Sequence, residues 1–209
     1  MRILVTAGPT REYLDDVRFL SNASSGVMGF SVAEAAVQSG HEVSLVSGPV
    51  ILPDPHGAGV VRVISAEEMA RECFQRFTDC DAVVMTAAVC DYRPNKQTTG
   101  KLKKGPGSFK LELERTPDIL EELGRRKAKQ ILVGFALEVQ EPRRNAENKL
   151  ARKNLDYIIL NTPETFGSEI ITCEIIGSEG TVRRFEKVTK QSLAHEIIKL
   201  IEKGHGGTS

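Results

Sequence analysis

Short apolar segments alternate along this chain with longer stretches that have the periodicity of helices. Short apolar runs bounded by turn residues are typical of buried strands. Strands that alternate with helices at this spacing form mainly parallel sheets. The sequence therefore predicts a Rossmann-like, doubly wound α/β fold. The strands are expected at 3–5, 42–46, 60–64, 81–86, 131–136 and 156–160, and the helices at 27–40, 65–77, from 116 onward, 143–154 and 190–203.

Some elements carry local signals of their own. Ser65 and Glu68 form a capping box, and Thr116 is expected to cap the next helix with Pro117 in first position. Residues 108–114 alternate apolar and polar side chains, which predicts a half-exposed strand. Lys149 and Lys153 lie one turn apart on one helix face, and paired lysines of this kind usually face solvent.

The C-terminal part is predicted to extend the sheet. Within residues 168–188, two β-branched and apolar runs flank the turn at 177–180, which indicates a hairpin. It is expected to be a sheet extension or a subunit contact. Residues 204–209 are expected to form a flexible tail. Because no repeat or domain boundary is evident, residues 1–209 are interpreted as a single domain.

Ligands of doubly wound sheets bind outside the carboxyl ends of the strands. Here those ends are the loops at 6–8, 47–49 and 86–89. After the first of them, the chain reaches 21–26, a Ser- and Gly-rich segment that opens a helix. Free N–H groups and the helix dipole favour an anion at such a start. A nucleotide or another phosphate compound is the first hypothesis.

A long lysine-rich connection follows the fourth strand, over residues 87–107. Between 96 and 110 the chain has five lysines and no acidic residue. Two readings stay open. The connection is either a solvated basic loop or a mobile flap, about residues 92–107, that closes lysines over phosphates and excludes water.

Composition excludes several classes of function. Lys+Arg and Asp+Glu both number 28, so the net charge is zero, which disfavours a nucleic-acid or membrane-surface binder. The four cysteines lack C-x-x-C spacing and are interpreted as buried or incidental thiols. The four histidines lack partners at ligand spacing, so no intrinsic metal site is expected. With no targeting or membrane-spanning segment recognised, the protein is expected to be cytoplasmic.

The familiar nucleotide and hydrolase signatures are absent. The first turn lacks G-x-G-x-x-G and no acidic residue follows the second strand, which argues against an ordinary NAD site. No G-x-S-x-G or P-loop lysine motif occurs. Tyr92 and Lys96 have Y-x-x-x-K spacing, but Pro94 between them disfavours the helix that such a pair needs.

Several separate motifs, in order, resemble phosphopantothenoylcysteine synthetase, the ligase half of the bacterial bifunctional coenzyme A biosynthesis protein. The resemblance covers nearly the whole chain. Its segments are GPTRE at 8–12, VR at 17–18, SNASSGVMG at 21–29, AAVCDY at 87–92, KLKK at 101–104, TPDI at 116–119, VGFA at 133–136 and residues 149–156.

The resemblance implies a reaction and a site. The family joins 4'-phosphopantothenate to L-cysteine; the bacterial type uses CTP, with Mg²⁺ on its phosphates, through an acyl-cytidylate that releases pyrophosphate and then CMP. Asn22, Lys101 and Arg18 are the implied catalytic residues, with Arg18 either on substrate phosphate or orienting Asn22. Asn22, Ala88, Lys103 and Lys104 are implied for the substrate. The implied nucleotide site is Gly8, Ser24, Ser25, Gly26, Ala87, Asp91, Lys101, Thr116, Pro117, Asp118, Ile119, Phe135, Lys149 and Lys153.

Three departures and several alternatives accompany this reading. Val27 stands where the family pattern usually has a basic residue, Cys90 where it has alanine, and Asn161 is not followed by the usual acid. The family acts as a homodimer. The flavin decarboxylase half is absent, so the chain is either a stand-alone synthetase, which a decarboxylase could join as a partner, or an excised domain. CTP and ATP remain undistinguished. The rival functions are a nucleotide-binding regulatory module and a nicotinamide- or flavin-dependent oxidoreductase.

Overall fold

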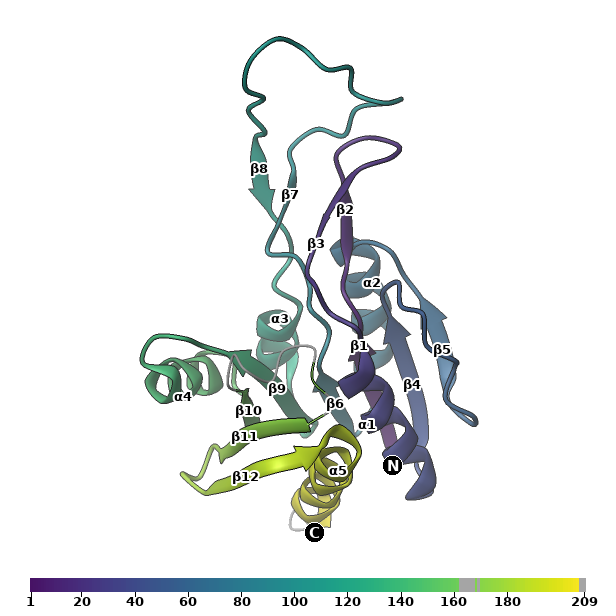
Figure 1. Cartoon of the computed structure of the whole chain (residues 1–209). Helices are drawn as coiled ribbons and strands as arrows, with labels where there is room; N and C mark the ends of the chain where they lie inside the picture. The colour runs from purple at the N-terminus through teal and green to yellow at the C-terminus, as the bar shows by residue number, and fades with distance from the viewer. Residues whose placement is uncertain (162–167, 169, 207–209) are drawn as a thin grey trace.

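The computed structural model describes residues 1–161, 168 and 170–206. Its centre is an eight-stranded sheet with the strand order β12-β11-β10-β9-β6-β1-β4-β5 (Figure 1). Neighbouring strands from β10 to β5 are parallel, and β10, β11 and β12 pair antiparallel. The predicted doubly wound, mainly parallel sheet is confirmed. Its strands are β1 Arg2–Ala7, β4 Glu42–Ser47, β5 Gly59–Arg62, β6 Ala82–Met85, β9 Ile131–Leu137, β10 Tyr157–Asn161, β11 Ile170–Gly177 and β12 Val182–Thr189.

Helices cover both faces of the sheet and bury a separate core on each. Helices α1 (Val27–Gln38) and α5 (Lys190–Gly206) pack with side chains such as Ile3 and Val5 of β1. Helices α2 (Ala66–Phe77), α3 (Ile119–Arg126) and α4 (Pro142–Arg152) cover the opposite face, where Leu4 points. Each fully buried aliphatic side chain stabilises the fold by roughly 1.5–3 kcal/mol. The central strands are apolar on both faces, because both are covered.

Helix starts follow the predicted chemistry at α2 and differ at α3. The capping box of Ser65 and Glu68 is present, and the Glu12 carboxylate also accepts the Ala66 N–H at 2.8 Å. At α3 the predicted Thr116 cap is wrong. Asp118 is the N-cap and accepts the N–H of Glu121 at 3.1 Å. The Thr116 hydroxyl instead donates to the carbonyl of Cys90.

Two C-terminal predictions have different outcomes. The hairpin is confirmed as an extension of the main sheet, formed by β11 and β12. The flexible tail is wrong for residues 204–206, which belong to the last turn of α5. Residues 207–209 lie outside the described residues.

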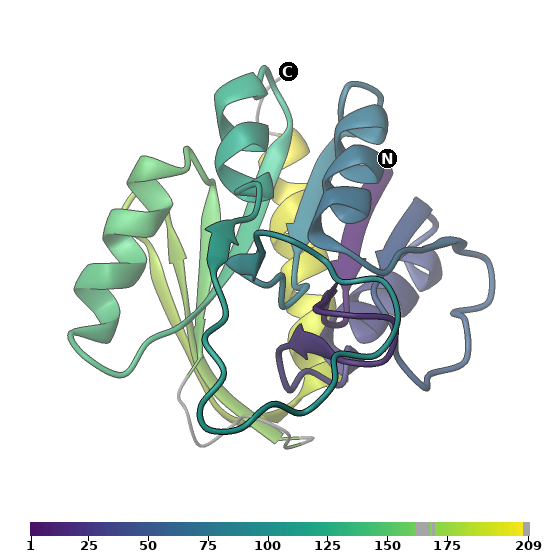
Figure 2. The ribbon, with the colours of Figure 1, turned by 90° about the horizontal axis from the view of Figure 1, so that it is seen from above.

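The two long excursions at the carboxyl edge of the sheet form an arm, defined by residues 11–21 and 92–115. Strands β2 (Arg11–Tyr13) and β3 (Phe19–Ser21) make one antiparallel ribbon, and β7 (Tyr92–Pro94) and β8 (Leu113–Arg115) make the other. The arm rises from the sheet edge in Figure 1, and Figure 2 shows the connection between β7 and β8 spread in front of that edge.

The half-exposed strand predicted for 108–114 is largely wrong, because only β8 is a strand. Phe109 is 68% exposed and Leu113 is 45% exposed. Their alternation has no sheet face to pack against at the arm.

Across the described ranges, no helix combines the length and apolarity that crossing a bilayer requires.

Candidate functional site

Two adjoining cavities open at the carboxyl ends of β6 and β9, and they share the wall formed by Ala87, Ala88, Asp91 and Phe135. We name them after the helices that flank them. The α1-side cavity has a volume of about 560 Å³ and the α3-side cavity about 500 Å³. The first is lined by residues 22–29, 86–88, 91, 135–137, 161, 171 and 190, and the second by 85, 87–89, 91–92, 115–120, 135, 149 and 153.

The loops after β1 and β6 are hydrogen-bonded to each other beneath these cavities. The Ala88 N–H donates to the Gly8 carbonyl at 2.9 Å, and the Cys90 N–H donates to the Thr10 hydroxyl at 3.0 Å. The Thr86 hydroxyl donates to the Thr6 carbonyl at 2.6 Å. These bonds fix the backbone on both sides of the shared wall, so the wall belongs to the rigid scaffold of the sheet.

Glycines bring the start of α1 close to β1. Gly26, the N-cap of α1, has φ +79° and Gly8 has φ +72°, which are left-handed conformations that favour glycine. A Cβ on Gly29 would lie 2.5 Å from the Ala7 Cβ. The helix starts without a side-chain cap and without an acidic residue in its first turn. Its first N–H groups and its dipole therefore face the α1-side cavity as an anion-binding element.

Asn22 lies at the rim of the α1-side cavity and is tied to the shared wall. Its Nδ2 donates to the carbonyls of Ala88 at 3.0 Å and Val89 at 3.1 Å. These two hydrogen bonds hold the amide nitrogen of Asn22 against the shared wall. The predicted donor role toward an acyl oxygen would require the amide to leave one of these carbonyls.

Lys149 and Lys153 line the α3-side cavity and are not the solvent-facing pair that the helical pattern indicates. Lys153 is only 8% exposed, and its Nζ lies 2.7 and 2.6 Å from the two carboxylate oxygens of Asp118. Lys149 donates to the Phe135 carbonyl at 2.8 Å. Desolvation, aided by the nearby charge of Lys153, lowers the pKa of Lys149. Both lysines are therefore held in place within the cavity wall by their protein partners.

The structure gathers most of the predicted nucleotide residues into this pair of cavities. Ser24, Ser25 and Gly26 line the α1-side cavity, and Ala87 and Asp91 line both. Gly8 lies beneath the wall and supports Gly26 through backbone packing. The segment 116–119 lines the α3-side cavity together with Phe135, Lys149 and Lys153.

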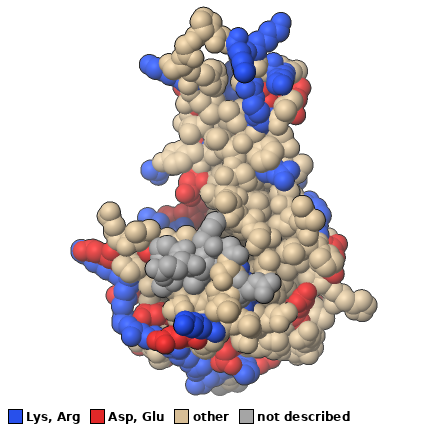
Figure 3. All heavy atoms as spheres, in the orientation of Figure 1, with Lys and Arg blue, Asp and Glu red and all other residues tan. Residues whose placement is uncertain are grey.

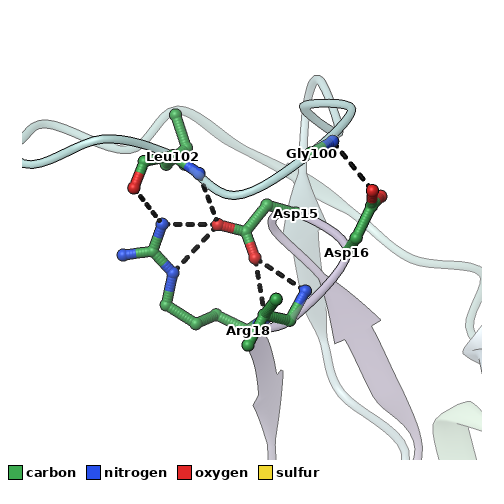
Figure 4. Close-up of polar contacts among 6 residues, drawn as sticks. Asp15, Asp16, Arg18, Gly100 and Leu102 are labelled. Atoms are coloured by element: carbon green, nitrogen blue, oxygen red, sulfur yellow. Dashed lines mark hydrogen bonds and ion pairs between the residues drawn. The ribbon is translucent and has the colours of Figure 1, made fainter.

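Arg18, Lys101, Lys103 and Lys104 are placed elsewhere, toward the tip of the arm, and line neither cavity. Figure 3 shows basic side chains gathered at the tip. Arg18 pairs with the buried carboxylate of Asp15 and donates to the Leu102 carbonyl at 3.0 Å (Figure 4). Arg18 therefore does not orient Asn22 in this arrangement. The catalytic and substrate-binding roles of these four residues stay predictions.

Asp15 holds the lysine-rich connection to the rest of the arm. Its carboxylate, which is fully buried, accepts the N–H groups of Val17, Arg18 and Leu102 at 2.8–3.0 Å. The bond from the Arg18 guanidinium is the main cause that holds the pKa of Asp15 below its ordinary value. This stabilisation is fully present above the ordinary Asp pKa of about 3.9 and is lost as the pH falls toward the lowered value.

The substitution Asp15→Asn is expected to loosen the connection at Leu102. Hydrogen bonds to a charged acceptor contribute about 1.5–3 kcal/mol, so hydrogen exchange of the Leu102 amide should accelerate by about tenfold or more. The exposed Asp79→Asn variant is the control. Unchanged exchange at Leu102 in the Asp15 variant would show that the carboxylate does not hold the connection.

Sequence reasoning missed two cations that line the cavities. Arg115, at the end of β8, lines the α3-side cavity, and Lys190, the first residue of α5, lines the α1-side cavity. Neither residue belongs to a motif. Each comes from an element that the sequence pattern assigned to packing or to a loop edge, so no local signal distinguished it from a surface charge.

None of the four cysteines lines either cavity. Within the described ranges, no group of three or more His, Cys, Asp or Glu side chains could hold a metal ion. The four cysteines are buried and free, as expected. Burial raises the pKa of Cys73, Cys80 and Cys173 to about 12, so their thiols stay protonated at neutral pH.

A doubly wound sheet with an uncapped helix start, two adjoining cavities and two lysines in the wall of one of them is the arrangement of an α/β protein suited to binding a phosphate compound. Comparison with known proteins identifies the family. The sequence profile of the DNA/pantothenate metabolism flavoprotein C-terminal domain matches residues 1–205, and the chain belongs to this family.

Relatives and a solved structure agree with that assignment. The coenzyme A biosynthesis bifunctional protein CoaBC of Bacillus subtilis (strain 168) is 44% identical over 204 residues, which cover 95% of this chain and 50% of the relative. A cysteine/cysteine sulfinic acid decarboxylase of an unknown prokaryotic organism is 44% identical over 206 residues, covering 96% of this chain and 57% of the relative. The chain spans about half the length of these curated relatives.

The crystal structure of the C-terminal domain of CoaBC is similar over almost the full length of both chains. It is 42% identical, covers 97% of this chain and 94% of its own, and has a TM-score of 0.84. The likeness therefore extends from the sequence motifs to the arrangement of the whole fold.

Proposed function

We propose that this chain is a ligase that joins 4'-phosphopantothenate and L-cysteine into 4'-phosphopantothenoylcysteine in coenzyme A biosynthesis. The observation that carries the proposal is spatial. Motif segments that lie far apart in the sequence, at 22–26, 87–91, 116–119, 135 and 149–153, meet around two cavities that share one wall. Membership of a family whose relatives include CoaBC supports the same reaction.

The proposed chemistry has two steps and uses CTP. A carboxylate oxygen of 4'-phosphopantothenate attacks the α-phosphorus, the α–β phosphoanhydride bond breaks, and pyrophosphate leaves. The amine of cysteine then attacks the acyl carbon of the acyl-cytidylate, the bond to CMP breaks, and the amine loses a proton. Both steps need positioning and charge neutralisation more than a protein nucleophile. The high thiol pKa values of the buried cysteines are consistent with that need.

Each cavity has a proposed part in this chemistry. The nucleotide occupies the α3-side cavity with its base near Phe135, and its phosphates extend past Asp91 toward the start of α1. Lys149 and Lys153, which are held by the Phe135 carbonyl and by Asp118, offer cations of fixed position. Asn22 contacts the acyl intermediate from the rim. Lys101, Lys103 and Lys104 approach the phosphates when the arm closes, and Arg18 contributes to a phosphate from the same tip.

Magnesium fits this site as an ion that the nucleotide brings with it. The shared wall offers one carboxylate, Asp91, and the described residues hold no cluster that could cage a metal. Mg²⁺ commonly binds through phosphates, waters and one or two carboxylates. The ion supplies charge neutralisation on the phosphates, and Asp91 is the residue that would hold it or the ribose.

The proposal is tested with purified protein, 4'-phosphopantothenate, Mg²⁺ and either CTP or ATP, with and without cysteine. Pyrophosphate release that requires phosphopantothenate, with CMP release increased by cysteine, is the expected result. The nucleotide that supports turnover names the co-substrate. Nucleotide binding without pyrophosphate release would favour the regulatory module, and a bound chromophore would favour the oxidoreductase.

We also propose that the chain acts as a homodimer beside a decarboxylase domain, fused or separate. This chain covers about half of the CoaBC relatives, which are named as bifunctional proteins. Their second half supports the proposal that a decarboxylase domain accompanies this chain. Exposed apolar side chains, including Val17, Tyr92 and Phe109, lie on the arm. By contrast, β12, the outer strand of the hairpin predicted as a possible subunit contact, is rich in charged side chains. A light-scattering mass near 22.9 kDa would contradict the dimer.

A further inference from the structure

The lysine-rich connection is bound to the turn between β2 and β3 on both sides of Lys101. Before this lysine, the Gly100 N–H donates to the Asp16 carboxylate at 2.8 Å (Figure 4). After it, the Leu102 N–H donates to the Asp15 carboxylate at 3.0 Å. Lys101 itself is exposed. Its backbone is therefore held from two sides while its side chain faces outward.

The Asp15 carboxylate also binds Arg18. Its Oδ2 accepts the Arg18 Nε–H at 2.9 Å, and the same oxygen accepts the Leu102 N–H. The Arg18 guanidinium in turn donates to the Leu102 carbonyl at 3.0 Å. Because the carboxylate is fully buried, leaving it without these partners would be costly. Arg18 and the backbone beside Lys101 are thus joined through one buried group.

We call this arrangement the clasp, defined by Asp15, Asp16, Arg18, Gly100 and Leu102. It separates the lysines of the connection into two kinds. Lys101 lies within the clasp, whereas the lysines at 103–104 lie beyond it. Further along, a Cβ on Gly105 or Gly107 would meet open space. The clasp therefore fixes Lys101 more tightly than the two lysines that follow it.

We propose that Asp15 is a positioning residue that holds Arg18 and Lys101 in a fixed relative placement, so that the two cations contact substrate phosphates as one unit. Asp16 supports the same placement from the other side of Lys101. This inference rests on the proposed function for the identity of the phosphate compounds. Asp15 does not contact a substrate, because its carboxylate is buried; it acts through the two cations. Misplacement of a reacting arrangement by about 1 Å can lower a rate by as much as about 100-fold.

The test is a double-mutant cycle between Asp15→Asn and Lys101→Ala in the full chain. It measures kcat and KM for CTP from pyrophosphate release that depends on phosphopantothenate. With Lys101 present, Asp15→Asn should lower kcat about tenfold and change KM at most about twofold, the pattern of a lost transition-state interaction. In the Lys101→Ala background the same change should lower kcat less than about threefold, the remainder acting through Arg18.

A second variant avoids the buried carboxylate. Asp16 is exposed, so Asp16→Ala removes the bond to Gly100 without leaving a buried group unpaired. It should lower kcat about threefold when Lys101 is present and leave kcat unchanged in Lys101→Ala. The matched control is Asp54→Asn, since this exposed aspartate pairs with Arg62 and lines neither cavity. It should retain the wild-type kcat in both backgrounds.

Calorimetric binding of inorganic tripolyphosphate with Mg²⁺ present, measured through the same cycle, separates this inference from the proposed function. If the wild type forms no product but Asp15→Asn weakens tripolyphosphate only when Lys101 is present, the proposed function fails and the positioning role stands. Equal losses with and without Lys101 in both measurements would overturn the inference, because they indicate a general structural defect. Wild-type kcat and tripolyphosphate affinity for Asp15→Asn would overturn it too. So would a wild type that neither releases pyrophosphate nor binds tripolyphosphate.

Discussion

Asn22→Ala is expected to leave pyrophosphate release from CTP within about threefold of wild type and to lower the rate of amide formation about 100-fold, the scale on which loss of one positioned polar group acts. The reason lies in the placement of Asn22 at the cavity rim, tied to the Ala88 and Val89 carbonyls. There it can orient the acyl group or the incoming amine, while the lysines that line the α3-side cavity remain unchanged. The acyl-cytidylate should accumulate and be detectable by mass spectrometry after acid quench.

Asn148→Ala is a suitable control, because Asn148 lies exposed on α4 and lines neither cavity. It should show wild-type rates for both steps. If Asn22→Ala formed amide at the normal rate, Asn22 would have no part in the second step. If it lost pyrophosphate release as well, its role would lie in nucleotide or carboxylate activation, and the assignment of the two steps to different residues would need to be revised.

The sheet and its helices could be predicted from sequence because their signals are local. Apolar runs such as residues 3–5 and 131–136 are short and bounded by turn residues, and the Ser65–Glu68 capping box is read within four positions. The arm could not be predicted. Its ribbons consist of three-residue strands, and β7 pairs with β8 across the long lysine-rich connection. Pairing over such distances leaves no periodic trace in the sequence.

The candidate site was predictable in part for the same physical reason. The start of α1 could be predicted because serines and glycines precede an apolar helix in the sequence. By contrast, helical spacing alone indicates a surface position for Lys153, because its partner Asp118 is 35 positions away, and only the family resemblance assigned it to the site. Lys190 looked like the start of a packing helix. Charge that is buried by a distant partner, or aimed into a cavity by a distant element, is recognisable only in three dimensions.

Gly124→Ala is expected to destabilise the fold by about 2 kcal/mol or more, although alanine is the better helix former by about 1 kcal/mol. A Cβ on Gly124 would lie 1.9 Å from the carbonyl oxygen of Lys153, a backbone atom that cannot move independently. Asn154 also donates to the Gly124 carbonyl at 3.0 Å. Helix α3 and the end of α4 must therefore separate to admit the methyl group.

The same separation should damage the α3-side cavity, because Asp118 caps α3 and binds Lys153 at the end of α4. The melting temperature should fall by about 5–10 °C for a domain of this size, and CTP affinity should fall with it at temperatures where the variant is folded. Gly105→Ala is the matched control, since a Cβ there meets open space. An unchanged melting temperature for Gly124→Ala would mean that the two helices are not held in contact at this point. Lowered stability with wild-type CTP affinity would show that the contact supports the fold without positioning the Asp118–Lys153 pair.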